Sequence, residues 1–497
     1  MNAAVPSTVA SLFASRARVR RTALALVGPE RSLTYGELLE RVARSATVLT
    51  AHGVGPGDRV AVLSRNRGEY LELFLAAAWL GAVVACQNWR LSDEELAHCL
   101  DLVAPTLLVA SPDEAARLAP RDEPVAVWGD AWEQSLASAV PMAAPAAVDP
   151  EQALLILYTS GTTGLPKGAV LSHRAEIARN LVLRAEFGVA SDDAYVAWTP
   201  LYHMGAAEYA LGTLMSGGTV FVVDGFDPER LAALVETESI GWLLLMPGMV
   251  GRFADVLERR GSVVRSVKLC GVMADLVPRA EIARVTRLLD APYANTFGAT
   301  ETGCPPCSSS LIGVGEVPEN LRKEQSPFCE VRLVDEDDRE VPDGTPGELC
   351  MRGPTLFSGY WAAEAANAEA FRDGWFHMGD VFVRHPDGTL DFVDRRKYLI
   401  KSGGENIYPA EIERVLLADP RVAEAAVVRR PDPTWGEVPV AFVARAEPSV
   451  SAADLIDLCT ARLARYKKPK DVVFIDADDF PRSASGKVQR HALEARL

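Results

Sequence analysis

The chain has 497 residues with a formal net charge of −16 at pH 7, and 48% of its residues are hydrophobic. This length exceeds what one hydrophobic core supports, so we expect two to four structural units. The acid excess argues against a nucleic-acid-binding protein, and no apolar run reaches about 18 residues, so no membrane span is expected. Eight cysteines are too few for a disulfide framework, which favours a reducing, cytoplasmic location.

The first predicted element is an amphipathic helix over residues 8–21, with Val9, Leu12, Phe13 and Val19 facing inward. The same segment contains Ser and Arg but no acid, a composition that transit peptides share. We favour the helix.

Apolar runs that favour strands alternate with helical patterns along the following part of the chain. Such alternation predicts α/β layers with largely parallel sheets. The predicted strands are residues 60–63, 107–110, 125–128, 153–157, 195–198, 219–223 and 242–246. Residues 32–39 predict a strand end, an N-cap and a helix, and a further helix is expected to begin near Gly68. The run 73–86 predicts a buried helix that leads into a strand. Residues 140–148 predict a surface connection.

The pattern changes between about residues 329 and 395. Short alternating runs are separated there by turns such as Asp343-Gly344 and Asp387-Gly388, which predicts a β-rich subdomain. After Arg395 a small α/β unit is expected, with strands at residues 423–428 and 438–443.

A loop rich in glycine and hydroxyl side chains follows the apolar strand 153–157. Residues 158–168 contain three glycines, four aliphatic hydroxyls and Lys167. Glycine lets backbone N–H groups approach a ligand, and the hydroxyls and the lysine add donors and a positive charge, so the loop predicts a phosphate cradle. Pro166 before the lysine and Gly168 after it exclude a Walker A loop. The alternative is a flexible surface turn.

Three more elements carry chemistry. Residues 297–303 place the single carboxylate of Glu301 on a tight turn, which suits Mg²⁺ because this ion takes one or two protein oxygens beside phosphate and water. Asp380, after a glycine, can accept two hydrogen bonds from a ribose diol. Near the C-terminus, residues 481–490 carry Lys487 in a Pro-Arg-x-x-x-Gly-Lys pattern. Taken alone, each of these has an ordinary turn or a solvated basic surface as its alternative.

The order and spacing of these elements resemble the adenylate-forming superfamily, which includes acyl-CoA synthetases, luciferases and the adenylation domains of peptide synthetases. The resemblance covers almost the whole chain and implies an α/β fold. It implies a large N-terminal domain, residues 1–395, of two layered α/β subdomains plus the β-rich subdomain, and a small mobile α/β C-terminal domain, residues 396–497.

The resemblance also implies roles for single residues. ATP would contact Thr159, Ser160, Gly161, Thr162, Thr163, Gly164, Lys167, Gly271, Phe297, Asp380 and Arg395. The catalytic residues would be Thr300, Glu301, His203 and Lys487. Glu301 would hold Mg²⁺, Lys397 would be the hinge, and Lys487 would bridge the attacking carboxylate and the α-phosphate.

Other residues favour the acid:CoA ligase branch. His203 lies where amino-acid-activating domains carry an Asp near the acyl pocket, and Trp435 lies in a segment similar to one that contacts coenzyme A. Gly404 would line the pantetheine tunnel, and Arg90 is a weaker candidate for the coenzyme's phosphates. The expected substrates are therefore a small carboxylic acid, ATP and coenzyme A.

The acid itself cannot be read from the residues, although its pocket is expected to be apolar and aryl-sized. The pocket candidates are Trp198, His203, Met204, Met246, Gly248, Gly298 and Cys304. Cys304 and Cys307 form a lone C-x-x-C, for which a pocket lining is favoured over zinc or redox chemistry. Glu208 is an unusual acid near the pocket, and its helical phase leaves open whether it faces inward or toward solvent. We expect aryl or short-to-medium acids to be preferred over long fatty acids.

Two segments depart from the family pattern: the adenine-binding segment, residues 270–275, lacks the usual Gly-Ala-x-Pro, and residues 323–328 replace a usual Gly-Ser-x-Gly-x-Pro. Two other function classes stay open. One is an adenylate synthase that passes its adenylate to a carrier protein or to oxidation, and the other is a non-catalytic sensor. A homodimer is a further possibility.

Overall fold

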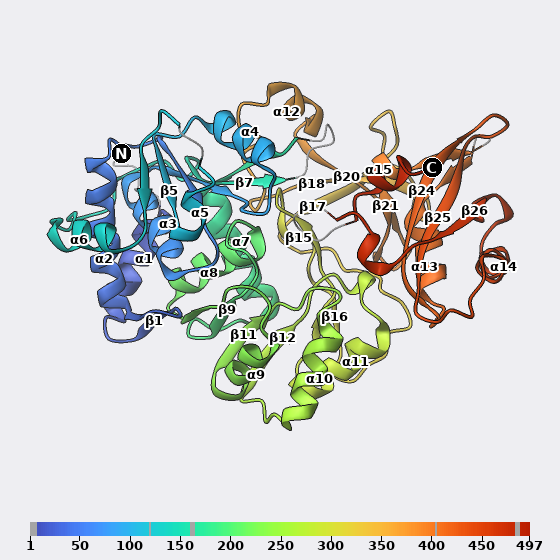
Figure 1. The fold of residues 1–497 in the computed structure, drawn as a ribbon, viewed down its shortest axis with the longest axis horizontal. Coiled ribbons are helices and arrows are strands. Elements are labelled where there is room, and N and C mark those ends of the chain that lie inside the picture. The colour runs from blue at the N-terminus through green and yellow to red at the C-terminus, as the bar shows by residue number, and fades with distance from the viewer. Residues whose placement is uncertain (1–6, 119–120, 160–164, 403–404, 483–487) are drawn as a thin grey trace. The chain divides into compact units, whose positions relative to one another are not determined.

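The computed structural model describes residues 7–118, 121–159, 165–402, 405–482 and 488–497 (Figure 1). It divides into two compact units: unit 1 is Met1–Glu330 with Arg352–Gly374, and unit 2 is Val331–Met351 with Trp375–Leu497. The predicted domain boundary after Arg395 stays a prediction.

One sheet of unit 1 has the strand order β16-β13-β12-β11-β9-β10-β1-β2. Its strands from β1 to β13 pair in parallel, and the edge strands β2 and β16 are antiparallel. The bounds are β1 Leu24–Val27, β2 Ser32–Thr34, β9 Ala194–Ala197, β10 Val220–Val222, β11 Ser239–Leu243, β12 Ser266–Cys270, β13 Tyr293–Ala294 and β16 Leu311–Ile312. The prediction of largely parallel α/β layers is confirmed.

A second sheet of unit 1 has the order β6-β5-β3-β4-β7-β8, parallel except for the last pair. Its bounds are β3 Arg59–Leu63, β4 Val83–Gln87, β5 Leu107–Ala110, β6 Val125–Val127, β7 Ala153–Thr159 and β8 Lys167–Ser172. A short hairpin of β14 Phe297–Ala299 and β15 Gly303–Cys307 and the strand β19 Phe371–Arg372 complete the strands described in unit 1.

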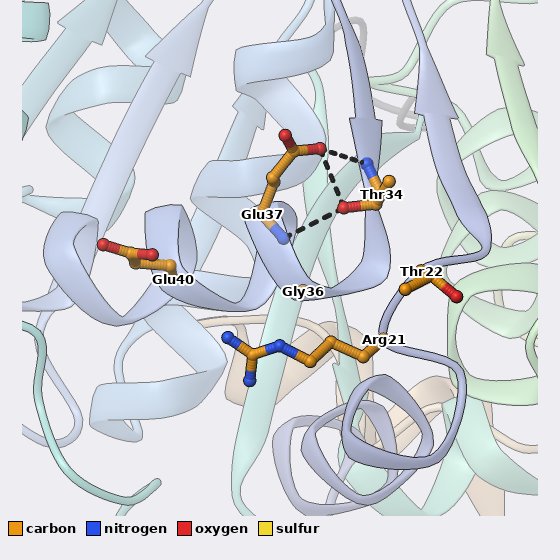
Figure 2. A pocket seen from close by; sticks show the side chains of 6 residues that line it. All are labelled: Arg21, Thr22, Thr34, Gly36, Glu37 and Glu40. Atoms are coloured by element: carbon orange, nitrogen blue, oxygen red, sulfur yellow. Dashed lines mark hydrogen bonds between the residues drawn. The ribbon is translucent and has the colours of Figure 1, made fainter.

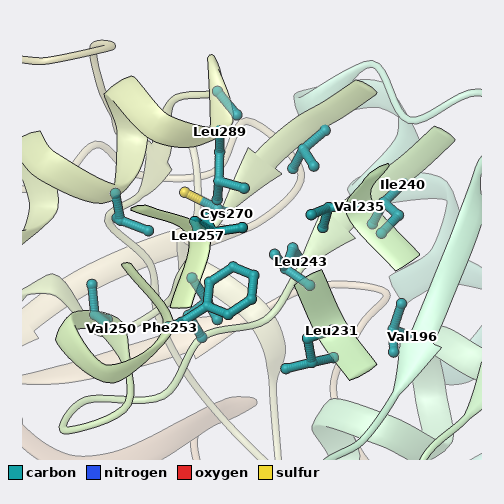
Figure 3. Close-up of a cluster of buried hydrophobic side chains, with 14 of the residues drawn as sticks. Val196, Leu231, Val235, Ile240, Leu243, Val250, Phe253, Leu257, Cys270 and Leu289 are labelled. Atoms are coloured by element: carbon teal, nitrogen blue, oxygen red, sulfur yellow. The ribbon is translucent and has the colours of Figure 1, made fainter. Parts of the chain in front are cut away.

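The helices of unit 1 cover these sheets. They are α1 Val9–Val19, α2 Tyr35–Ala51, α3 Gly68–Leu80, α4 Asp93–Val103, α5 Pro112–Ala115, α6 Asp130–Ser138, α7 His173–Phe187, α8 Met204–Ser216, α9 Pro228–Thr237, α10 Val250–Arg260, α11 Arg279–Leu289 and α12 Glu364–Ala370, with a 3₁₀ turn at Ala274–Leu276. In Figure 3, apolar side chains of α9, α10 and α11 gather with those of β11 and β12 in one buried cluster. This cluster packs the three helices against β11 and β12, and the candidate site lies at the carboxyl ends of these strands.

A local signal accounts for the start of α2. Thr34 accepts a hydrogen bond from the Glu37 amide at 3.3 Å, and the Glu37 carboxylate accepts from the Thr34 amide at 2.8 Å (Figure 2). This capping box satisfies two donors that the first turn would otherwise leave open. It confirms the helix predicted from residues 32–39. The surface hollow in Figure 2 lies beside this cap and contains none of the candidate site residues.

Two local predictions were wrong in detail. Val19 is 75% exposed, because the buried face of α1 runs through Val9, Phe13 and Ala17 at helical spacing. The strand predicted at residues 242–246 begins earlier and ends at Leu243. β11 pairs with β12 from Ser239 to Leu243. The limits of β11 therefore follow from pairing with the neighbouring strand, and the apolar run in the sequence does not mark them.

Unit 2 contains two sheets. In one, β17 Glu330–Val334, β18 Pro346–Arg352, β20 Trp375–Arg384 and β21 Leu390–Arg395 lie side by side. In the other, β22 Ile400–Ser402, β23 Glu405–Ile407, β24 Val422–Asp432, β25 Gly436–Arg445 and β26 Asp471–Phe474 pack on α13 Pro409–Leu417 and α14 Ala452–Arg462. Short turns at Arg396–Tyr398, Arg465–Lys467 and Ala477–Asp479 and the helix α15 Arg490–Glu494 complete it. Across the described ranges, no helix combines the length and apolar character that a bilayer crossing needs.

Candidate active site

The predicted phosphate loop joins two antiparallel strands. β7 and β8 form a hairpin in which Thr159 faces Lys167 across the ladder. The apolar residues before the loop, Leu154 to Leu157, are buried as expected. The five residues from Ser160 to Gly164 (Ser160, Gly161, Thr162, Thr163 and Gly164) lie outside the described residues. The structure therefore places the two ends of the loop.

The lysine of this loop lies over an aromatic ring. The Lys167 ammonium is 5.3 Å from the centroid of the Tyr360 ring. The Tyr360 hydroxyl donates a hydrogen bond to the Glu301 carboxylate at 2.9 Å. The Trp361 amide donates to the Gly168 carbonyl at 2.8 Å, which fixes the tyrosine beside β8. One side chain thus joins the predicted phosphate lysine to the predicted metal carboxylate.

The turn that carries Glu301 is tightly built. Thr302 Oγ1 accepts from the Ala299 amide at 2.9 Å, and β14 and β15 pair on either side of the turn. A Cβ at Gly298 would lie 1.9 Å from the Gly303 carbonyl oxygen, so only glycine fits there. The Glu301 carbonyl accepts from the Phe357 amide at 2.9 Å. The backbone of the turn is therefore held from several sides.

A buried charged cluster lies behind the turn. Arg179 of α7 forms an ion pair with Glu208 of α8, and its other nitrogens donate to the carbonyls of Thr300 at 3.0 Å and Thr355 at 2.8 Å. Glu208 is 2% exposed, which answers the open question of its direction: it faces inward. Burial raises the carboxyl pKa of Glu208, and Arg179 opposes the shift. The fully buried Glu176 beside it has a carboxyl pKa raised well above its usual range by burial and by Glu208.

Four site candidates follow the carboxyl ends of neighbouring strands. Trp198 comes after β9, Met246 after β11, Gly271 after β12 and Phe297 after β13. These strands are adjacent in the order β13-β12-β11-β9. In open parallel sheets this edge is where ligands bind. The tertiary structure thus places residues that are about one hundred positions apart at one sheet edge.

The predicted acyl residues differ in their surroundings. Trp198 is 3% exposed and donates from Nε1 to the Leu244 carbonyl at 2.8 Å. Met246 packs against the core cluster of Figure 3. The Cys304 sulfur lies 2.8 Å from the hydroxyl oxygen of Tyr209 in a hydrogen bond.

Three further acyl candidates lie at the start of α8 or in a turn. His203 is the N-cap residue of α8, Met204 begins that helix, and the His203 ring lies 4.6 Å from the ring of Tyr202. Gly248 has a φ of +80°, which favours glycine.

Gly271 is required by packing. Its φ is +73°, and a Cβ there would lie 2.0 Å from the Tyr293 ring. Its carbonyl accepts from Trp242 Nε1 at 2.9 Å.

Unit 2 pairs the two predicted ribose residues. Asp380 of β20 faces Arg395 of β21 in the ladder, and their side chains form an ion pair at 3.1 Å. Lys397 lies in the short turn Arg396–Tyr398 that follows. Burial raises the carboxyl pKa of Asp394 to about 6, with Arg490 opposing the shift. Gly404 and Lys487 lie outside the described residues.

The coenzyme candidates lie on exposed structure. Trp435 is 51% exposed at the tip of the β24–β25 hairpin, where Asp432 accepts from the Trp435 amide at 3.0 Å. In unit 1 the Arg90 guanidinium lies 4.8 Å from the Trp89 ring, which Arg65 also contacts at 4.2 Å.

Two family models match the chain. The model of the AMP-binding enzyme matches residues 13–361, and that of the AMP-binding enzyme C-terminal domain matches residues 411–487. The chain belongs to the AMP-binding enzyme family.

Relatives and solved structures of AMP-binding enzymes resemble the chain along its length. It is 38% identical over 492 residues to a feruloyl-CoA synthase from Amycolatopsis sp, with 97% of each chain covered. It is 35% identical over 479 residues to an indoleacetate–CoA ligase from Aromatoleum aromaticum, covering 93% of this chain and 92% of the relative. The o-succinylbenzoate CoA synthetase from Bacillus subtilis, solved with its acyl-adenylate intermediate, matches with a TM-score of 0.85, 28% identity and 97% of both chains covered. The same synthetase with ATP and a magnesium ion matches with a TM-score of 0.83, 27% identity and 97% and 99% coverage.

Three residues of this AMP-binding enzyme were missed by sequence reasoning. Tyr360 contacts Lys167 and Glu301, yet no local pattern marks it. Arg179 could have been noticed, because it follows Glu176 at a helical spacing of three. Lys323 lies in the unexplained segment 323–328 and is fully buried.

Proposed function

We propose that this chain is an ATP-dependent carboxylic acid:CoA ligase. It forms an acyl-adenylate with release of pyrophosphate, and then an acyl-CoA thioester with release of AMP. The observation that carries the proposal is the contact chain from Lys167 through Tyr360 to Glu301 at the end of a predicted phosphate loop. The CoA-ligase names of the relatives support the same reaction.

The residues fit a nucleotide with Mg²⁺. Lys167 offers a compact positive charge for phosphate oxygens, and Glu301 offers one carboxylate, as Mg²⁺ sites beside phosphates commonly do. When bound, Mg²⁺ neutralises charge on the phosphates. In unit 2, Arg395 holds the Asp380 carboxylate on its strand, where it can accept from a ribose diol.

In the first step a carboxylate oxygen of the acid bonds to the α-phosphorus of ATP, and the bond from that phosphorus to the pyrophosphate oxygen breaks. Lys487 neutralises the charge that develops, and Lys167 and Thr300 hold the phosphates, which is how such transfers are generally catalysed. His203 lies at the start of α8, at the acyl side of the site.

In the second step the coenzyme sulfur bonds to the acyl carbon, AMP leaves with the former carboxylate oxygen, and the thiol proton passes to solvent. A rotation about Lys397 removes Lys487 and brings Gly404 and Trp435 to the site. The exposure of Trp435 suits a ring that stacks on a nucleotide base. Arg90 is proposed to contact the coenzyme's phosphates.

The acid is proposed to be an aryl or short-to-medium acid. Two aromatic side chains favour flat apolar substrates: Trp198 at the sheet edge and Tyr209 on α8. The relatives named above are a feruloyl-CoA synthase and an indoleacetate–CoA ligase, which supports an aryl acid. Cytoplasmic location is part of the proposal, since all eight cysteines are free thiols. A homodimer stays a prediction, checked by light scattering.

One assay separates the function classes. The protein is given ATP, Mg²⁺ and a panel of ferulic, indoleacetic, benzoic, octanoic and palmitic acids, with and without coenzyme A. We expect pyrophosphate without the coenzyme, and AMP with thioester only when it is added. Pyrophosphate release with no thioester formation would indicate an adenylate synthase, and nucleotide binding with no pyrophosphate would indicate a sensor. A higher kcat/KM for palmitate than for every other acid would overturn the substrate proposal.

A further inference from the structure

A fully buried lysine lies beside the predicted adenine segment. Lys323 has 0% exposure. Its ammonium contacts Asp275 Oδ2 at 2.6 Å, Asn295 Oδ1 at 2.6 Å and the Leu321 carbonyl at 3.3 Å. A buried charge persists only when it is paired and hydrogen-bonded, so these partners hold the lysine in place and are held by it.

These partners connect two loops at the sheet edge. Asp275 lies in the turn after β12, and Asn295 directly follows β13. β12 and β13 are neighbouring parallel strands, and both loops leave from their carboxyl ends. The side-chain nitrogen Nδ2 of Asn295 donates to the carbonyls of Leu321 and Arg322, each at 3.1 Å. Lys323 therefore links the loop after β12 to the segment that leads to Phe297.

The loop between β12 and Asp275 is held at nearly every residue. The Gly271 carbonyl accepts from Trp242 Nε1, and the Val272 carbonyl accepts from the Tyr293 hydroxyl at 3.0 Å. Met273 has a φ of +55°, a left-handed backbone conformation that residues other than glycine rarely adopt. Such a conformation persists only where the surroundings enforce it. The Asp275–Lys323 ion pair supplies the anchor on the far side of Met273.

The ion pair also joins the two segments that depart from the family pattern. Asp275 belongs to residues 270–275, and Lys323 begins residues 323–328. Without an acid at position 275, the Lys323 ammonium would be buried without the carboxylate that it contacts in this structure.

We propose that Lys323 is a positioning residue for the nucleotide base. Through Asp275 and Asn295 it sets the conformation of residues 271–273, and so sets the preference for ATP over nucleotides with another base. This inference rests on the proposed function, because it takes the loop to be the adenine site.

The test uses the full-length protein with Lys323→Met and Asp275→Asn. Loss of a charged partner predicts a rise of roughly tenfold or more in the Kd for ATP by calorimetry and in its KM. The ratio of kcat/KM for ATP to that for GTP should fall, while the KM values for acid and coenzyme A stay unchanged. The matched control is Lys268→Met, which breaks the Lys268–Asp193 ion pair of 3.0 Å on β12 itself and should leave ATP binding unchanged.

The double variant tests whether the two residues act as one device. If they do, K323M/D275N loses no more ATP affinity than Lys323→Met alone, because interacting pairs are not additive. Equal weakening of ATP and GTP, additive losses, or parallel increases in all three KM values would overturn the inference in favour of a structural role. If Lys323→Met does not fold, the partly exposed Asp275 carries the same test. Failure of the proposed function is a separate result, because the wild-type protein would then release no pyrophosphate with any acid.

Discussion

The hydroxyl of Tyr360 donates to the carboxylate of Glu301 at 2.9 Å, and the same ring lies 5.3 Å from the Lys167 ammonium. The tyrosine thus orients the proposed metal carboxylate and contacts the proposed phosphate lysine at once. A phenylalanine would keep the ring and lose the hydrogen bond.

Tyr360→Phe should therefore slow pyrophosphate release by roughly tenfold, since a hydrogen bond to a charged group contributes about 1.5–3 kcal/mol. Thioester formation from supplied acyl-adenylate should be unaffected. The control is Tyr466→Phe on the exposed surface of unit 2. A normal rate of pyrophosphate release would contradict the role of Tyr360.

Glu301→Gln keeps the shape of the turn and removes its charge. The Mg²⁺ concentration for half-maximal activity should rise roughly ten- to a hundredfold, the equivalent of about 1.5–3 kcal/mol. Titrations of Mg²⁺ and ATP measure this. Unchanged dependences on both would remove Glu301 from the site.

The proposed domain alternation predicts that two variants fail in opposite halves of the reaction. Lys487→Ala should slow adenylate formation by roughly a hundredfold or more, the scale of removing one transition-state donor. It should still convert supplied acyl-adenylate and coenzyme A to thioester. Lys397→Pro restricts φ at the hinge and should show the reverse pattern.

Both halves can be measured separately, by pyrophosphate release without coenzyme A and by thioester formation from acyl-adenylate. Equal losses in both halves for both variants would exclude the alternating mechanism.

Arg179 is the only cation that contacts the Glu208 carboxylate among the described ion pairs. Arg179→Met leaves the Glu176 and Glu208 carboxyl groups buried without the guanidinium of Arg179. Breaking a buried ion pair typically lowers the free energy of unfolding by about 3–5 kcal/mol. Denaturant unfolding should show this loss. The control Arg284→Met breaks exposed ion pairs with Asp255 and Glu258 and should cost at most about 1 kcal/mol. Similar losses in the two variants would contradict the assignment.

His173 predicts a pH dependence of stability. It is fully buried, its Nδ1 accepts from the Val9 amide at 3.3 Å, and burial lowers its pKa to about 4. The folded state disfavours protonation of His173, so protonation of this residue costs stability. The free energy of unfolding that depends on neutral His173 is fully present above about pH 6.5. It falls by roughly 3 kcal/mol as the pH drops toward 4.

His173→Gln does not titrate, so its free energy of unfolding should fall less between pH 6.5 and 4 than that of the wild type. Parallel curves for the two proteins would show that His173 does not carry this dependence.

Local patterns in the sequence determined most of the secondary structure and the order of the motifs. The run before Tyr158 became the buried strand β7, and the Thr34–Glu37 capping box started α2 where it was expected. These features depend on side-chain periodicity and on contacts between residues a few positions apart, so they can be read along the chain. The β11 strand was misplaced because a neighbouring strand sets its limits.

The tertiary structure alone decided how the charges of the site are held. Tyr360 and Glu301 are 59 residues apart, and Arg179 and Thr300 are 121 apart, so no local pattern relates them. The direction of Glu208 depended on whether its helix face meets the core, which helical phase alone does not settle. A buried carboxylate or ammonium is stable only beside a partner, and the fold decides which distant residue becomes that partner.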